Sequence, residues 1–187
     1  MRSDDEMLSV DKLEADSAFK KYNKDILWKY LKEQGFYKRK TNSYVRRNDI
    51  DLLEYIDLQK ECHGSKTFTV NCALMPLYVP TEYMVIGFGN RLGELITSKD
   101  IWWDYSNDDI ARKSFQNITD AIEQFALPWF QHFNNETAYK KQLKKDARKS
   151  YYEYDNKTWL DAVDMRHDRE YVIAENVKRL KLPQKLL

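Results

Sequence analysis

The sequence has almost no excess of charge of either sign. It contains 31 basic and 30 acidic residues, which give a formal net charge of +1. A chain without a net field is not drawn as a whole onto nucleic acid or anionic lipid, so binding of that kind would need a local patch of charge. We therefore expect neither nucleic acid nor membrane as a general partner.

Long apolar runs are missing as well. No run approaches the roughly 18 residues that a membrane-spanning helix needs. The first residues, MRSDDEMLSVDKLEADS, are acidic where a signal peptide would be basic and then apolar. These features predict a cytoplasmic protein.

Cysteines and catalytic motifs are also scarce. The strand register derived below places Cys62 and Cys72 too far apart for a disulfide, so we expect free thiols in a reducing compartment. Together with His63 they offer the ligand types of a zinc site but not its geometry. None of the three histidines lies in a recognised nucleophile motif. We therefore predict no metal, no cofactor and no catalytic residue, which favours a protein that is not an enzyme.

Aromatic and charged residues, in contrast, are abundant. The chain is 42% hydrophobic, 14% aromatic and 33% charged, which is typical of a globular protein with an aromatic core. Charge increases beyond Asn134. We predict three parts: a flexible acidic N-terminus at 1–15, an α+β domain at 16–134 and a helical C-terminal extension at 135–187.

The domain is predicted to start with a helix. Apolar residues at helical spacing indicate a helix from Asp16 to Gln34, with Gly35 as its left-handed C-cap. Trp28 lies off the apolar stripe of this helix. A basic turn at 38–42 follows, and alternation of apolar and polar residues then predicts antiparallel strands.

Two hairpins follow from the alternation. The first has a tight turn at Asn48-Asp49, which would place Val45 opposite Leu52 and Arg46 opposite Asp51. In the second, the apolar residues share a face only if Leu58 lies opposite Val70 and Ile56 opposite Cys72. The same register gathers five side chains on the other face, namely Tyr55, Asp57, Gln59, Thr69 and Asn71. This face is either simply solvated or a polar binding surface.

The stretch GFGNRLGELITSKDIWWDYSN at 87–107 lies around two further predicted strands, 82–90 and 100–105. It fits neither a Walker loop nor a dinucleotide fingerprint. We interpret its glycines as making room for Trp102 and Trp103. A capping box from Ser106 to Asp109 then opens a helix that packs on the sheet. The predicted fold is α+β: an antiparallel sheet of about five strands in meander order, covered on one face by helices.

Arg91 has two interpretations. It could bind a carboxylate or phosphate in a pocket framed by Gln59, Asn71 and Trp102. Alternatively, it could be locked to a carboxylate such as Glu94, which would make the stretch part of the core.

The extension begins with a basic amphipathic helix. Its charged side carries Lys140, Lys141, Lys144, Lys145 and Arg148. Such a side is either a solvated surface or a face that lies along a phosphate backbone. The acidic residues of the chain, which can neutralise it, favour the solvated surface.

The order and spacing of several short runs resemble a known family. These runs are GFYKRKTNSYVRR, IDLQK, FTVN, RLGEL, WW and LPWF. Over roughly residues 18–133 the chain resembles the bacterial family domain of unknown function four-three-zero-four, although it has LQKE at 58–61 where that family usually has LQKS. The resemblance implies an intracellular bacterial protein and no established activity. Some small families of this kind are encoded near secreted toxins and neutralise them.

Two functional hypotheses follow. In the first, the protein is a non-catalytic binding module, immunity-like in the sense of toxin neutralisation, with Tyr55, Trp28 or Trp159 as an aromatic anchor. In the second, it binds a small molecule or an anion, or acts as an enzyme, at a pocket near Arg91.

Overall fold

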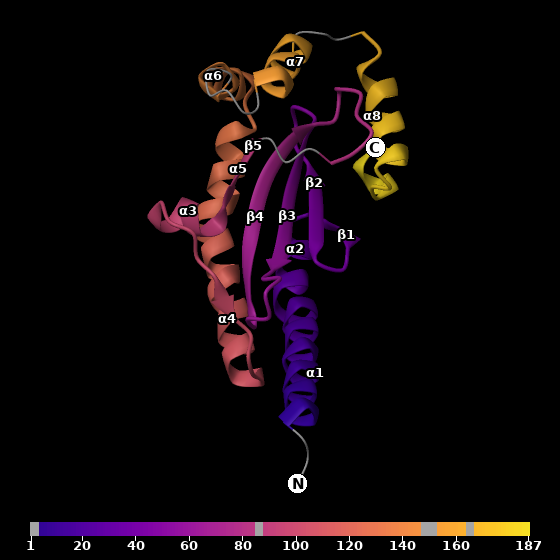
Figure 1. Cartoon of the computed structure of the whole chain (residues 1–187). Helices are drawn as coiled ribbons and strands as arrows, with labels where there is room; N and C mark the ends of the chain where they lie inside the picture. Colours follow the sequence, from indigo (N-terminus) through magenta and orange to yellow (C-terminus); the bar gives the residue numbers. More distant parts are fainter. Residues whose placement is uncertain (1–3, 85–87, 147–152, 164–166) are drawn as a thin grey trace.

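The computed structural model describes residues 4–84, 88–146, 153–163 and 167–187 (Figure 1). It contains a six-stranded antiparallel sheet, with helices before it, after it and between its last two strands. The predicted α+β class and the helical C-terminal region are confirmed.

The N-terminal helical segment consists of α1 (Asp4–Tyr22), a π-helical part η1 (Asn23–Trp28) and α2 (Lys29–Glu33). It starts at Asp4, well before the predicted Asp16, so the acidic residues that we predicted as flexible are helical from Asp4 on. Glu, Met, Leu, Lys and Ala, which are good helix formers, are frequent from residue 6 to residue 15, and Asp4 and Asp5 suit the positive N-terminal end of a helix. Gly35, with a φ of +82°, takes the left-handed conformation expected after a helix.

The sheet has its strands in meander order from β1 to β5, with the short β6 pairing with β4. Their bounds are β1 (Tyr37–Lys40), β2 (Ser43–Arg47), β3 (Leu52–Lys60), β4 (Thr67–Pro76), β5 (Phe88–Arg91) and β6 (Trp103–Asp104). The segment that we predicted as a basic turn is largely strand β1, an edge strand whose outward lysines discourage pairing with another chain. Of the predicted strand 82–90, residues 82–84 are not strand, residues 85–87 lie outside the described residues and β5 is described from Phe88 on, whereas the predicted strand 100–105 is reduced to Trp103–Asp104.

The prediction for the first hairpin was wrong. Arg46 lies opposite Glu54, not Asp51, and Val45 lies opposite Tyr55, not Leu52. The turn is wider because the Asn48 side chain accepts hydrogen bonds from two backbone N–H groups, those of residues 50 and 52, at 3.2 and 2.9 Å. An asparagine that caps its own loop in this way replaces the tight two-residue turn.

The second hairpin has the predicted register. Leu58 lies opposite Val70 and Ile56 opposite Cys72. Cys72 is buried and Cys62 is exposed, and both are free thiols.

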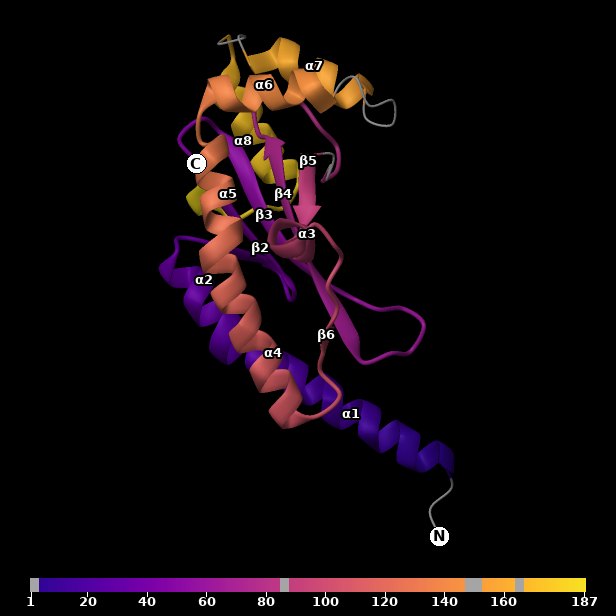
Figure 2. The same cartoon turned by 90° about the vertical axis from the view of Figure 1, so that its left-hand side faces the viewer.

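Helices cover one face of the sheet (Figure 2). After α3 (Leu92–Thr97), the chain forms α4 (Asp108–Ala121), a second π-helical part η2 (Ile122–Ala126) and α5 (Leu127–Phe133). Aromatic rings join the layers: Phe68 of β4 lies 5.0 Å from Phe19 of α1 and 5.1 Å from Phe115 of α4, measured between ring centroids. The core is therefore an aromatic layer between the sheet and these helices.

The N-cap of α4 is one residue later than predicted. The Asn107 side chain, not that of Ser106, accepts the hydrogen bond from the Ile110 backbone N–H, at 2.9 Å. Both residue types suit a cap. Ser106 instead continues the turn by donating its backbone N–H to Asp104.

The extension comprises α6 (Glu136–Asp146), α7 (Glu153–Val163), α8 (Arg169–Arg179) and a short 3-10 helix, η3 (Gln184–Leu186). Helix α8 lies beside the β1–β2 edge of the sheet (Figure 1). There Arg169 forms an ion pair with Asp51 at 2.9 Å and donates to the carbonyl of Ile50 at 3.0 Å.

Extension and sheet are packed together at several points. Tyr139 of α6 is fully buried and its ring lies 5.4 Å from that of Phe88. The predicted division between residues 134 and 135 as a domain boundary stays a prediction. None of the helices in the described ranges has both the length and the apolar character needed to cross a bilayer.

Candidate functional site

Four neighbouring strands each contribute one polar residue to a row across the sheet. The register places Ser43 of β2 opposite Asp57 of β3, Asp57 opposite Asn71 of β4, and Asn71 opposite Arg91 of β5. We call these four residues the polar row. Partners in an antiparallel sheet point to the same face, so the five predicted residues share a face and Arg91 belongs to it, but Tyr55 and Thr69 of this set are buried.

Hydrogen bonds hold the middle of the row in place. Asn71 donates from Nδ2 to Oε1 of Gln59 at 3.1 Å. Burial raises the pKa of Asp57, although the Tyr55 hydroxyl and Asn71 donate to its carboxylate. Burial also raises the pKa of Tyr55 to about 12, so its hydroxyl keeps the proton that it donates. Asp57 and Asn71, in the middle of the row, are therefore held by hydrogen bonds to each other and to Tyr55 and Gln59.

Asp100 organises the Arg91 end of the row. Its carboxylate pairs with the Arg91 guanidinium and accepts from Nε1 of Trp102 at 2.9 Å and from the Thr69 hydroxyl at 3.3 Å. The Arg91 guanidinium also lies 5.3 Å from the centre of the Trp102 ring. Trp102 thus remains 38% exposed and is held by two neighbours.

Arg91 is bound to a carboxylate, but not to the one that we predicted. Glu94 accepts from the backbone N–H of Arg91 at 2.9 Å as a cap of α3, while Asp100 pairs with the guanidinium. Residue 100 lies two positions before Trp102 in a loop, and no periodicity marks it. Sequence reasoning therefore missed Asp100.

Gly89 and Gly93 do not make room for the two tryptophans, and the third glycine of this stretch, Gly87, lies outside the described residues. A Cβ on Gly89 would lie 2.6 Å from the carbonyl oxygen of Cys72, and a Cβ on Gly93 would lie 2.4 Å from the backbone N of Ile101. Both glycines allow close approach of backbone to backbone. The interpretation made from the sequence was therefore wrong, because these two glycines make room for backbone atoms and not for the indole rings.

The predicted aromatic anchors differ in how accessible they are. Trp28 stacks on Tyr44, with ring centroids 5.6 Å apart and planes at 13°, and Lys38 lies over it at 5.1 Å. It lies in the π-helical part, where a stripe drawn with 3.6 residues per turn misplaces side chains. Trp159 is only 4% exposed and Tyr55 only 6%. Among the aromatic residues of our candidate set, Trp102 is the exposed one.

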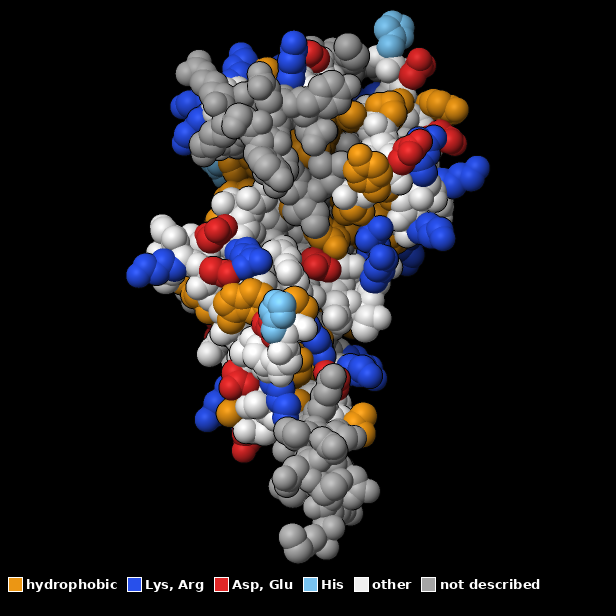
Figure 3. All heavy atoms as spheres, in the orientation of Figure 1, with side chains coloured by type: hydrophobic (Ala, Val, Ile, Leu, Met, Phe, Trp, Pro, Cys, Tyr) orange, Lys and Arg blue, Asp and Glu red, His pale blue; other side chains and the backbone are white. Residues whose placement is uncertain are grey.

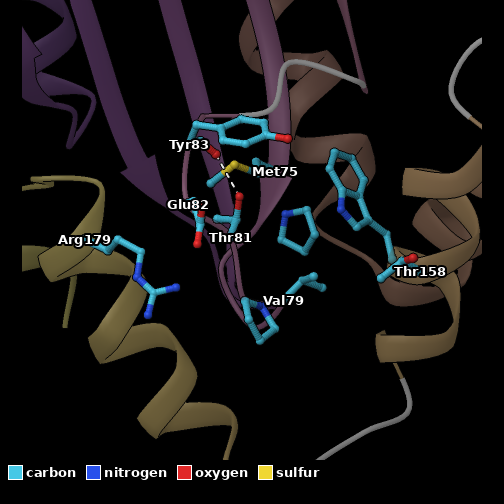
Figure 4. A pocket seen from close by; sticks show the side chains of 10 residues that line it. Met75, Val79, Thr81, Glu82, Tyr83, Thr158 and Arg179 are labelled. Carbon is cyan, nitrogen blue, oxygen red and sulfur yellow. Dashed lines mark hydrogen bonds between the residues drawn. The ribbon is translucent and has the colours of Figure 1, made fainter.

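A hollow of about 460 Å³ lies between the sheet and the extension. Figure 4 shows residues 79–83 running between Arg179 of α8 on one side and Thr158 of α7 on the other. We call it the apolar hollow because five of its ten lining residues are Met75, Pro76, Val79, Pro80 and Trp159.

Asn176 of α8 fixes the loop that forms one wall of this hollow. Its Nδ2 donates to the carbonyls of Leu77 and Val79 at 2.8 and 2.7 Å, and its Oδ1 accepts from the Thr81 N–H at 3.2 Å. The Thr81 hydroxyl in turn donates to the carbonyl of Tyr83 at 2.8 Å, the dashed line in Figure 4. Tyr83 is thereby presented with its side chain 70% exposed.

Comparison with known proteins gives a match over the sheet and part of the helices that cover it. A family model matches residues 27–132, more than half of the 187-residue chain, and its description is Domain of unknown function (DUF4304). The chain belongs to the DUF4304 family. No match was found among curated proteins or among solved structures.

The DUF4304 segment contains the whole polar row, together with Asp100 and Trp102. The apolar hollow is different, because Thr158, Trp159 and Arg179 lie outside the matched segment. The polar row therefore lies entirely within the family segment, whereas the apolar hollow is formed in part by residues outside it.

The basic helix of the extension, which follows the DUF4304 segment, is α6. Lys141, Lys144 and Lys145 are exposed and line a hollow of about 730 Å³ with His132, while Lys140 is half-buried and has a partner. Arg148 lies outside the described residues. These lysines come from one helix face, which agrees with a solvated surface.

One hairpin loop in the DUF4304 segment has metal-ligand types close together. Ligand atoms of Glu61, Cys62 and His63 lie within 4.8 Å of one another. The Glu61 carboxylate already accepts from the backbone N–H groups of His63 and Ser65 at 2.7 and 3.0 Å, and these bonds lower its pKa. Its oxygens thus serve as a loop cap, while Cys72 is buried on a strand away from the loop.

Proposed function

We propose that this DUF4304 protein is a non-catalytic protein-binding module whose partner docks on the polar row and Trp102. The observation that carries the proposal is the state of Trp102, which is exposed but fixed by Asp100 and Arg91. An aromatic side chain that is already ordered loses little entropy on binding, which is the property of an interface anchor.

The surroundings of Trp102 support a protein partner. Half-buried Asp57 and Asn71 and exposed Gln59 offer donors and acceptors in a fixed arrangement. On the face seen in Figure 3, side chains of both charges lie close together in the middle of the molecule. Mixed charge with one aromatic anchor suits a protein surface better than a polyanion.

The partner that we propose is a protein toxin, because some small families of this kind are encoded near secreted toxins and neutralise them. The proposal also includes the cytoplasmic location, where the exposed thiol of Cys62 stays reduced. Co-expression with the product of a neighbouring gene tests this part: rescue of growth by the wild-type protein, and not by Trp102→Ala, is the expected result.

Affinity capture from the native host tests the binding function. Wild-type protein, Trp102→Ala and the control Tyr171→Ala serve as baits, since Tyr171 is also an exposed aromatic but lies on α8. We expect one stoichiometric partner with wild type and control, and at least about thirtyfold weaker binding of the purified partner to Trp102→Ala. Failure to recover a partner, or equal affinity of all three proteins, would overturn the proposal.

The second hypothesis, an anion site at Arg91, has less support. Asp100 already neutralises the guanidinium, and Trp102 covers one side of it. If Arg91 nevertheless binds a free anion, then titration of wild-type protein with phosphate would shift the fluorescence of Trp102, and Arg91→Gln would abolish the shift.

A further inference from the structure

A second hollow beside the apolar one is lined by cations from distant parts of the chain. Its volume is about 450 Å³, and we call it the basic hollow. Arg39 and Lys40 come from β1, and Arg179 and Lys181 come from the end of α8 and the residues after it. The remaining lining residues are Glu82, Tyr83, Met84 and Leu180.

The four cations form no ion pair within the described part of the chain. Arg46, Arg47 and Arg169 each pair with a carboxylate, whereas none of the four takes part in an ion pair with a described residue. The chain has 30 acidic residues for its 31 basic ones. Grouping four cations around one hollow with a single glutamate therefore produces a local positive field that the overall composition does not require.

Arg39 connects this hollow to the polar row. Its Nε is buried and has no hydrogen-bond partner among the described residues. Its charge acts on Asp57, as does that of Lys40. A buried guanidinium nitrogen without a partner is costly, so a ligand that accepts from it would gain affinity.

Lys181 has a backbone conformation that usually belongs to glycine. Its φ is +53°, in the turn where the Leu182 N–H returns to the Val177 carbonyl at 2.9 Å. Glycine is the usual residue at this place after a helix because it adopts this conformation without strain. The sequence instead places a long cationic side chain at the rim of the basic hollow.

The basic and apolar hollows adjoin each other, because Glu82, Tyr83 and Arg179 line both of them, and we call the two together the groove. Tyr83 lines both hollows, and its carbonyl accepts from the Thr81 hydroxyl (Figure 4). In Figure 3, Lys and Arg side chains gather next to hydrophobic ones on the side of the molecule where α8 lies. The groove thus has an apolar end and a cationic end.

We propose that this groove binds an acidic peptide segment of a partner protein. Carboxylates of the segment pair with Arg39, Lys40, Arg179 and Lys181, and an adjacent apolar side chain enters the apolar hollow beside Tyr83. The apolar end favours a peptide over free phosphate or nucleic acid, neither of which offers an apolar group next to its charges. The inference rests on the proposed function only in that the ligand is a protein.

Direct binding of a synthetic peptide tests the groove without knowledge of the natural partner. The probe is a fluorescein-labelled peptide of one leucine followed by six glutamates, and anisotropy measures its affinity for the full chain. We expect Arg179→Glu combined with Lys181→Glu to weaken binding by about tenfold or more. Replacement of the leucine of the peptide by glycine should weaken binding too, as should Tyr83→Ala.

A matched control separates the groove from general charge. Lys141→Glu combined with Lys144→Glu makes the same change in net charge on exposed lysines of α6 and should leave the affinity unchanged. Circular dichroism of both double variants checks that they fold. Equal losses in the two double variants, no effect of the leucine, or tighter binding of inorganic pyrophosphate than of the peptide would each overturn the proposal.

The two proposals fail separately. If no partner is captured on Trp102, the proposed docking on the polar row is lost, while the peptide measurements still stand by themselves. If charge reversal in the groove has no effect on the peptide, this inference is lost and the role of Trp102 is untouched.

Discussion

At the scale of single residues, Asn176 joins helix α8 of the extension to the loop at residues 77–81. It is 1% exposed and makes three hydrogen bonds to residues 77–81. Asn176→Ala leaves two carbonyls and one N–H without their partner, and we expect it to lower the free energy of unfolding by about 3 kcal/mol. Denaturant titration measures the change.

The control for this substitution is Lys178→Ala, which lies on the same helix but is exposed. It should change stability by less than about 0.5 kcal/mol. Similar effects of the two substitutions would mean that the Asn176 hydrogen bonds are replaced by water without loss.

Asp57 gives a prediction about pH. Burial raises its pKa in the folded protein above the ordinary value of 3.8, so the folded state holds the proton more tightly than the unfolded state. The contribution of Asp57 to the stability of the fold is therefore complete when the pH lies below its ordinary pKa. It is lost as the pH rises through the raised pKa of the folded protein. Asp57→Asn should be more stable than wild type at neutral pH, and the difference should shrink in acid.

The measurement is the free energy of unfolding of both proteins across this pH range, expressed as the difference between them so that all other titrating groups cancel. A difference that does not vary with pH would show that Asp57 has the same pKa in both states.

At the scale of elements, the start of α4 allows the two possible caps to be compared directly. Asn107 provides the cap hydrogen bond and Ser106 does not. Asn107→Ala should therefore cost about 1 kcal/mol of stability, as for other N-caps, and Ser106→Ala close to nothing. Thermal or chemical unfolding of the two variants distinguishes them, and the reverse order would restore the prediction made from the sequence.

An element could be predicted from the sequence where one hydrophobic period runs through the whole helix or strand. The second hairpin could be predicted residue by residue because Ile56, Leu58, Val70 and Cys72 must share a face, and a slip of one residue would bury the polar set. The first hairpin could not, because its loop depends on one side chain, Asn48, bonding to the backbone. The π-helical parts likewise break the 3.6-residue period, which is why Trp28 was assigned to the wrong side.

The candidate site was predictable in part for the same reason. Asp57, Asn71 and Gln59 follow from strand alternation, and Arg91 joins them because β5 pairs with β4. Asp100 lies in a loop, and the basic hollow joins residues about 140 positions apart in the sequence. No local pattern could indicate either of them.

At the scale of the whole molecule, we expect the DUF4304 segment and the extension to unfold together. Tyr139 packs on Phe88, and Arg169 and Asn176 bond to residues 50, 51 and 77–81. Circular dichroism and tryptophan fluorescence should therefore give one coincident transition. Two separate transitions would instead support a domain boundary at residues 134–135.

The position of strand β4 in the sheet affects folding of the chain during its synthesis. Residues 68–76 of this strand pair with β3 along one edge, but the other edge is shared by β5 and β6, which come later in the chain. As the chain leaves the ribosome, that edge stays open until residue 104 has emerged, and α8 arrives later still. An open strand edge is prone to wrong pairing, so slower elongation between residues 76 and 104 should increase aggregation of nascent chains.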